Sequence, residues 1–210
     1  MSLANIRTTY STGALNESDL DANPITQFEQ WLNEALNTNI VEATAFCLAT
    51  SDKTGRPSAR IVLLKGVSTE GFSFFTNYSS RKGENLAANP YAAMNFYWDE
   101  LERQVRIEGT VSKLSPEASE AYFRSRPLGS QMGALVSEQS QPIASRGILE
   151  ERLKGLEAQY GENPPFPDNW GGYLVKPEII EFWQGRPNRL HDRLRYRLIN
   201  GNWIVERLQP

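Results

Sequence analysis

Residues 186–197 concentrate positive charge around the only histidine of the chain. The stretch contains His191 together with Arg186, Arg189, Arg193, Arg195 and Arg197. The 210-residue chain nevertheless has a formal net charge of -3, so it offers no general basic field to a nucleic-acid backbone. A planar guanidinium binds phosphate or carboxylate through two parallel hydrogen bonds. The cluster therefore favours a small anionic ligand that is held locally.

Two further stretches place cations at the ends of expected elements. In "RIVLLK", Arg60 and Lys65 bracket an apolar strand and point to opposite faces of it. In "TNYSSRKGEN", Arg81 and Lys82 follow hydroxyl residues at an expected helix start, where free backbone N–H groups favour an anion. Solvated strand ends and an ordinary capped helix are the alternatives, so neither stretch alone decides for a phosphate site.

A third stretch, "AYFRSRPLGSQ", combines an aromatic hydroxyl with a cation. Tyr122 and Arg126 are four residues apart and share one face of a helix. Ser130 lies one turn further if the helix continues, although Pro127 favours a break. These side chains could form a second phosphate clamp. The alternative is an exposed basic helix end, which the helix dipole stabilises.

Other chemistries find no support in the sequence. One cysteine and one histidine exclude zinc sites of the four-cysteine or two-cysteine, two-histidine type, and we expect no metal. Cys47 lies in the apolar run "TAFCLAT" and is expected to pack in the core. There is no "GxSxG", "GxGxxG" or Walker motif. No apolar run approaches the ~20 residues of a membrane span, so we expect neither a membrane nor a nucleic-acid partner.

The positions of turns and caps predict the elements that carry these residues. Asn23 and Pro24 begin a helix, and further helices are expected over 79–89, from Ser115, over 131–137 and over 144–160. Strands are expected over 44–51, 58–67, 72–77, 91–98, 103–114, 171–176, 179–185, 195–199 and 203–208. Short links favour antiparallel neighbours. We therefore predict an α+β protein with a polar arm over 1–22 and a single domain over 23–210.

Several motifs together resemble the pyridoxamine 5′-phosphate oxidase family. They are "RIVLLKG", "FFTNYSSRKGENLAANP", "WDELERQVRIEGTVSKL", "YFRSRPLGSQMGALVSEQS", "WGGYLV" and "IEFWQGRPNRLHDR". The resemblance runs from about residue 5 to the C-terminus. It implies an FMN-binding split β-barrel with flanking helices that works as a homodimer, with FMN at the subunit interface. We expect a cytoplasmic enzyme, because a single cysteine fits a reducing compartment.

The resemblance also assigns residues to the two ligands. The implied FMN contacts are Arg60, Ile61, Val62, Leu63, Leu64, Lys65, Phe75, Thr76, Arg81, Lys82, Gln104, Gln139, Ser140, Trp183 and Arg193. The implied substrate contacts are Lys65, Tyr122, Arg126, Ser130, Arg189, Leu190 and His191, with Arg7 and Tyr10 from an N-terminal segment that folds over the site in some members. Arg189 and His191 are the implied catalytic residues. Phe75 stands where members often have Tyr, and Pro187 restricts a loop that varies.

The implied reaction is oxidation of pyridoxamine or pyridoxine 5′-phosphate to pyridoxal 5′-phosphate in vitamin B6 metabolism. A hydride passes from the substrate C4′ carbon to the flavin, and dioxygen reoxidises the flavin to give hydrogen peroxide; the amine substrate also releases ammonia. Two alternatives stay open at this point. One is another split-barrel flavin or deazaflavin-dependent reductase, and the other is a non-catalytic protein that binds pyridoxal phosphate.

Overall fold

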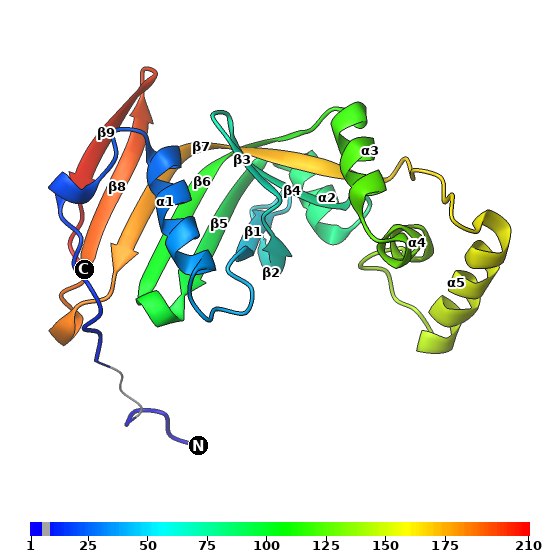
Figure 1. Cartoon of the computed structure of the whole chain (residues 1–210), viewed down its shortest axis with the longest axis horizontal. Helices are drawn as coiled ribbons and strands as arrows, with labels where there is room; N and C mark the ends of the chain where they lie inside the picture. Colours follow the sequence, from blue (N-terminus) through cyan, green and yellow to red (C-terminus); the bar gives the residue numbers. More distant parts are fainter. Residues whose placement is uncertain (6–8) are drawn as a thin grey trace.

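A curled antiparallel sheet forms the body of the protein in the computed structural model, which describes residues 1–5 and 9–210 (Figure 1). Within these residues the sheet has nine strands: β1 (Ala45–Ser51), β2 (Pro57–Leu63), β3 (Gly66–Ser68), β4 (Gly71–Asn77), β5 (Tyr91–Trp98), β6 (Arg103–Lys113), β7 (Trp170–Gln184), β8 (Asp192–Ile199) and β9 (Asn202–Arg207). Their order is β2-β1-β5-β6-β7-β4-β3, and the hairpin β8–β9 extends from β7. The α+β class and the antiparallel pairing predicted from the short links are confirmed.

Helices flank this sheet on one face and beyond one end. They are α1 (Pro24–Leu36), α2 (Arg81–Ala88), α3 (Pro116–Ser125), α4 (Leu128–Val136) and α5 (Arg146–Tyr160). Asn23 caps α1 as predicted, because its side chain accepts a hydrogen bond from the Ile25 backbone N–H at 2.9 Å. Figure 1 shows α3, α4 and α5 beyond one end of the sheet and the β8–β9 hairpin at the other. The two ends can therefore carry different parts of a site.

The core lies between α1 and the concave face of the sheet. Phe28 on α1 is fully buried, and its ring lies 4.9 Å from the ring of Phe72 and 5.0 Å from that of Phe96. Edge-to-face aromatic packing of this kind adds to the burial of apolar area. The apolar periodicity that predicts the first helix thus also fixes the helix against β4 and β5.

β7 corrects the expectation of two separate strands over 171–176 and 179–185. It runs unbroken through Pro177, which cannot donate a ladder hydrogen bond. The pairing with β6 shifts register between Glu108 and Gly109, so that Gly109 pairs with Pro177 and Glu108 with Ile179. This β-bulge leaves Glu178 as the extra residue and accommodates the proline. The outcome is a single 15-residue strand that connects the two ends of the sheet.

The prediction of one strand over 58–67 is wrong, because the structure has two strands there, β2 and β3. β2 ends at Leu63, where the chain turns. The Leu64 N–H then donates to the Thr44 carbonyl and the Lys65 N–H to the Ser73 carbonyl, both at 2.9 Å. Leu64 is 5% exposed and packs in the core, whereas Lys65 is exposed. The break thereby separates an apolar anchor from a cation.

The described part of the N-terminal region lies along the β8–β9 end of the sheet. Arg207 on β9 makes two hydrogen bonds of 2.8 Å to the Glu17 carboxylate, and it also donates to the Leu15 carbonyl. The division into an arm over 1–22 and a domain over 23–210 stays a prediction. No helix in the described residues is long and apolar enough to cross a membrane.

Candidate functional site

A cavity of about 320 Å³ lies where the basic and hydroxyl-rich stretches of the sequence meet. β2 and the segment after it form one wall, and β4, α2, α3 and the start of β7 form the others. The lining residues are Arg60, Ile61, Val62, Leu63, Lys65, Phe75, Thr76, Lys82, Tyr122, Arg126, Gln139 and Trp170. All except Trp170 belong to the residues that the sequence predicts for the two ligands.

Lys82 is a buried cation on one wall of this cavity. Its Nζ donates to Gln139 Oε1 at 2.6 Å, Thr76 Oγ1 at 3.1 Å and Ser80 Oγ at 3.3 Å. Burial, with the nearby Arg60 charge as a second cause, lowers the pKa of Lys82 to about 8. In the described part of the chain no carboxylate forms an ion pair with it. A desolvated ammonium without a counter-ion is suited to bind an anion.

Arg60 on β2 adds a second positive charge near Lys82. Its guanidinium donates to the Leu48 carbonyl at 3.0 Å, to Thr50 Oγ1 at 2.8 Å and to Ser58 Oγ at 2.5 Å. Burial lowers the pKa of Arg60, and the charge of Arg81 acts in the same direction. Three cations therefore gather near the start of α2 and repel one another. A ligand with more than one negative charge would relieve that repulsion.

Aromatic rings and Arg126 form another part of the cavity lining. The rings of Phe75 and Tyr122 are stacked with centroids 3.8 Å apart, and the Trp170 ring is nearly parallel to that of Tyr122. The Arg126 guanidinium carbon lies 4.7 Å from the centroid of the Trp170 ring. Its Nη1 is buried and has no hydrogen-bond partner among the described residues. This donor is available to a ligand.

Ser130 and Arg126 both line a second cavity, of about 310 Å³. α3 ends at Ser125, before Pro127, and α4 starts at Leu128, so the predicted break at the proline is confirmed. The second cavity is lined by Asn77, Arg126, Ser130, Gly133, Ala134, Ser137, Gln139 and Trp170. Arg126, Gln139 and Trp170 border both cavities, and the two spaces therefore adjoin.

Three predicted contacts from the same stretches of sequence, Leu64, Arg81 and Ser140, do not line the first cavity. Leu64 is buried in the core, so its side chain packs beneath the cavity wall. Arg81 is exposed at the start of α2. Ser140, with φ 76° in the left-handed region, lines a separate cavity of about 150 Å³ with Gln139.

A second group of predicted residues, the histidine cluster, lies at the other end of the sheet. It consists of Tyr10, Gln104, Trp183, His191 and Arg193. Gln104 pairs with Trp183, and Trp183 with Arg193, across β6, β7 and β8. Ring centroids of Trp183 and His191 are 4.6 Å apart, and the Tyr10 ring lies 5.6 Å from that of His191.

A backbone hydrogen bond and the lowered pKa indicate the tautomer and protonation of His191. The Arg186 backbone N–H donates to His191 Nδ1 at 3.1 Å, so Nδ1 acts as the acceptor. Burial, followed by the Arg189 charge, lowers the pKa of His191 and favours the neutral ring. A neutral imidazole with Nδ1 as acceptor carries its proton on Nε2, which can donate to a ligand.

The loop before His191 exposes two further predicted residues. Arg189 and Leu190 are exposed, and Arg189 has φ 61° in the left-handed region. Pro187 opens this turn, a short 3-10 helix over Pro187–Arg189. Arg189 forms no ion pair with any residue that the structure describes. The predicted contact Arg7 lies outside the described residues.

The cavity and the histidine cluster are too far apart to meet within one chain. Phe75 of the cavity pairs with Gly172 near the start of β7, whereas Gln104 pairs with Trp183 near its end. Eleven residues of extended strand span up to about 36 Å. Figure 1 shows the corresponding ends of β7 at opposite sides of the sheet. One ligand can contact both groups only if a second chain contributes.

Two residues that shape this site, Trp170 and Glu181, are not predicted from the sequence. Trp170 is uncharged, and only its position between the cavities shows its importance. Glu181, 4% exposed, accepts two hydrogen bonds from Arg193 at 2.8 and 3.1 Å. Glu181 is on β7 and Arg193 is on the neighbouring strand β8, twelve residues later. Local sequence spacing therefore does not predict their contact.

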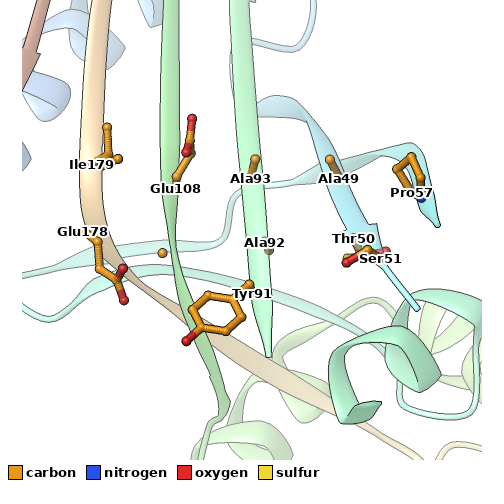
Figure 2. A pocket seen from close by; sticks show the side chains of 11 residues that line it. Ala49, Thr50, Ser51, Pro57, Tyr91, Ala92, Ala93, Glu108, Glu178 and Ile179 are labelled. Atoms are coloured by element: carbon orange, nitrogen blue, oxygen red, sulfur yellow. The ribbon is translucent and has the colours of Figure 1, made fainter. Parts of the chain in front are cut away.

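A third cavity, of about 350 Å³, lies on the outward face of the sheet (Figure 2). The small side chains of Ala49 and Ala93 leave space for this cavity, and its lining also includes Tyr91, Glu108 and Glu178. It contains no predicted site residue and no cation. No group of three or more metal-ligating side chains occurs in the part of the chain that the structure describes. The first two cavities and the histidine cluster therefore hold the candidate chemistry.

Comparison with known families covers most of the chain. Residues 32–160 match the family described as pyridoxamine 5′-phosphate oxidase. Residues 170–210 match a region described as pyridoxine 5′-phosphate oxidase C-terminal dimerisation region. The latter range contains all of β7, β8 and β9, including Trp183, His191 and Arg193 of the histidine cluster.

Individual relatives agree with these matches. The chain is 59% identical to the pyridoxine/pyridoxamine 5′-phosphate oxidase of Paraburkholderia phymatum and 54% identical to that of Cupriavidus pinatubonensis, over 99% of each chain. Among solved structures, PhzG from Burkholderia lata in complex with tetrahydrophenazine-1-carboxylic acid is 31% identical, with a TM-score of 0.90 over 95% of this chain and 100% of that one. An FMN-binding protein from Nostoc punctiforme, 19% identical with a TM-score of 0.71, shares the fold. The predicted split-barrel fold with flanking helices is confirmed.

Proposed function

The chain belongs to the pyridoxamine 5′-phosphate oxidase family, and from this premise we propose that it oxidises pyridoxamine and pyridoxine 5′-phosphate to pyridoxal 5′-phosphate with FMN as its cofactor. The observation that carries the proposal is the cavity with unpaired cations on two walls. Lys82 and Arg60, with the charge of the exposed Arg81 nearby, form one group of cations, and Arg126 with its unpartnered Nη1 forms the other. The cofactor and the substrate are both phosphate esters. Their reaction therefore requires two groups of cations, one for each phosphate.

The residues present fit FMN. Lys82, Arg60, Thr76 and Gln139 would hold its phosphate, since they combine desolvated cations with hydroxyl and amide groups. Bound FMN would supply the two-electron acceptor for oxidation at the substrate C4′ carbon, with dioxygen as the final oxidant and hydrogen peroxide as its product. The chain contributes orientation and electrostatics, which suits a protein with one cysteine and one histidine.

The remaining cavity residues would hold the substrate. Lys65, Tyr122 and Arg126 line the first cavity, Arg126 and Ser130 line the adjoining second one, and these four residues would bind the substrate phosphate. The neutral His191 would donate from Nε2 to a ring substituent, and Arg189 would position the C4′ group. For the amine substrate, oxidation at C4′ would leave an imine, and its hydrolysis by water would yield the aldehyde and ammonia.

The working protein is proposed to be a homodimer in which each site takes the cavity from one chain and the histidine cluster from its partner. The separation along β7 requires this arrangement if one site uses both groups. The match of residues 170–210 to a dimerisation region supports it. Closed two-fold symmetry would create two identical sites. A cytoplasmic location stays a prediction.

The purified protein should be yellow, release FMN on denaturation and consume oxygen with pyridoxine 5′-phosphate. One hydrogen peroxide should form for each pyridoxal 5′-phosphate. Three results contradict the proposal in distinct ways. Failure to bind FMN on reconstitution removes the cofactor assignment, and stoichiometric binding of pyridoxal 5′-phosphate without oxygen uptake indicates a carrier. Pyridine-nucleotide-dependent flavin reduction without oxidation of the ester indicates a reductase.

The lowered pKa of Lys82 predicts how FMN affinity depends on pH. Below about pH 8 the ammonium is charged in the FMN-free protein and binds the phosphate directly. Above pH 8 the free lysine is neutral, so binding must take up a proton, and the affinity should fall by up to about tenfold per pH unit. The phosphate itself stays doubly charged, because its second pKa is about 6.

Flavin fluorescence titrations between pH 7 and pH 9.5 measure this slope. Lys82→Arg should bind FMN with little pH dependence, since guanidinium stays protonated throughout. Lys113→Arg, at an exposed lysine at the end of β6, is the matched control and should keep the parent slope. A parent affinity that is flat to pH 9.5 would contradict the placement of the phosphate at Lys82.

A further inference from the structure

We propose that Trp170 is the positioning residue of the substrate-phosphate clamp: its indole holds Arg126 and Tyr122 in place and so sets the preference for phosphorylated over unphosphorylated substrates. The inference rests on the proposed function, since it concerns the substrate half of that site. Trp170 is 7% exposed and forms a wall common to the two adjoining cavities. Arg126 and Gln139 are the other residues that border both.

The first observation is how Arg126 is held. The start of its side chain is fixed at the end of α3, where its N–H donates to the Phe123 carbonyl at 3.2 Å and its carbonyl accepts from Gln131 Nε2 at 2.8 Å. The far end lies over the Trp170 ring, 4.7 Å from the centroid. No described carboxylate forms an ion pair with it.

An aromatic support differs chemically from an acidic one. A carboxylate would fix the guanidinium but would neutralise its charge and occupy its donors, so an incoming phosphate would have to compete. A ring face attracts the cation through its quadrupole and leaves the N–H edge free. The buried, unpartnered Nη1 of Arg126 is the result expected from such a support. Trp170 therefore positions a cation while keeping it available to an anion.

The second observation concerns Tyr122. Its ring is 4° from parallel to the Trp170 ring at a centroid distance of 6.2 Å, and Phe75 stacks on it at 3.8 Å. Phe75 also lies 5.7 Å from Trp170 at an angle of 17°. The three rings form one stacked aromatic group. The Tyr122 hydroxyl is the polar group that this aromatic group contributes to the clamp. Loss of the indole would remove the ring beneath Arg126 and, at the same time, one of the two parallel rings beside Tyr122.

Trp170 is itself anchored to the sheet. It is the first residue of β7 and pairs with Asn77 at the end of β4. Its ring packs edge-on against the buried Phe123 of α3 at 5.5 Å. Figure 1 shows α3 beside this end of β7. The indole thus links the sheet to α3, which carries Tyr122 and is followed directly by Arg126.

The test compares pyridoxine 5′-phosphate with unphosphorylated pyridoxine in the FMN-loaded enzyme. Trp170→Leu should lower kcat/KM for the phosphate ester by about 10- to 30-fold, mainly through KM, since a desolvated cation–π contact is lost. Unphosphorylated pyridoxine should lose less than about threefold, because it makes no contact with the clamp. Trp170→Phe retains a ring face and should lie between the parent and the leucine variant. FMN content should stay at the parent level in both.

Two further measurements separate positioning from general stability. Pyridoxal 5′-phosphate, added to the holoenzyme and followed by its absorbance, should bind the leucine variant about 10-fold more weakly. In an Arg126→Ala background, Trp170→Leu should cause little further loss of discrimination, because the two residues act as one unit. Trp203→Leu, at a partly buried tryptophan on β9, is the matched control and should leave the substrate ratio unchanged.

The outcomes are distinct. Equal losses for both substrates in Trp170→Leu and Trp170→Phe would make Trp170 a general packing residue and overturn the inference. If the leucine variant does not fold, the phenylalanine variant decides, since an unchanged substrate ratio there has the same meaning. A parent enzyme that does not oxidise pyridoxine 5′-phosphate at all would instead refute the proposed function.

Discussion

A heterodimer assembled from two inactive variants is expected to recover about half of the parent activity per dimer. One variant, Lys65→Ala with Arg126→Ala, removes cations from the cavity, and the other, Arg189→Ala with His191→Ala, alters the histidine-cluster end. Each homodimer should retain below about one per cent of the activity, because two proposed substrate contacts are lost at both sites. In the heterodimer, one site combines the unaltered cavity of one chain with the unaltered Arg189 and His191 of its partner.

The expectation follows from the position of the two groups on β7. The cavity lies at its start and the histidine cluster at its end, up to about 36 Å apart along an extended strand. No rotation of a side chain closes such a gap. Co-expression with two different affinity tags, followed by purification through both, isolates the heterodimer for an oxygen-uptake assay.

A reciprocal heterodimer provides the control with the opposite outcome. When all four substitutions lie on one chain and the other chain is unaltered, each shared site contains one altered part, so activity should be near zero. If each site instead belonged to a single chain, this second heterodimer would keep half of the activity and the first would have none. That reversed pattern would refute the shared site.

The sequence predicts the individual elements of this architecture better than it predicts their connection. Asn23, Ser80 and Ser115 cap helices that start where the local pattern indicates, because capping depends on neighbouring residues. β7 could not be predicted as one strand, since local propensity places a break at Pro177. Only the bulge opposite Glu108 and Gly109 permits the proline, and that bulge depends on a strand some seventy residues earlier.

The arginines near the histidine show the same limit. Local spacing presents them as one group of free cations, but the structure pairs four of the five with carboxylates. Arg193 is bound to Glu181, Arg195 and Arg197 to Glu206, and Arg186 lies 3.4 Å from Asp192. Arg189 is the one left without an ion pair among the described residues. Charge density in a sequence therefore overestimates the number of cations that a ligand can use.

Arg126→Ala is expected to lower kcat/KM for pyridoxine 5′-phosphate by about 10- to 100-fold. A charge-assisted hydrogen bond contributes roughly 1.5–3 kcal/mol, and about 1.4 kcal/mol corresponds to a tenfold change in rate. The buried Nη1 of Arg126, which no described residue binds, is the donor that the substrate phosphate would satisfy. Burial lowers the pKa of Arg126, and a dianionic ligand offsets that cost of desolvation.

Unphosphorylated pyridoxine distinguishes a phosphate contact from a general defect. It cannot use Arg126, so the substitution should barely change its slow turnover, and the discrimination between the two substrates should shrink by the same 10- to 100-fold. Arg124→Ala is the matched control, because Arg124 is two residues away on α3 and is engaged with Glu120 and the Pro164 carbonyl. It should leave the ratio unchanged. If Arg126→Ala instead slows both substrates equally while FMN stays bound, Arg126 does not bind the phosphate, and the division of the cavity between cofactor and substrate is wrong.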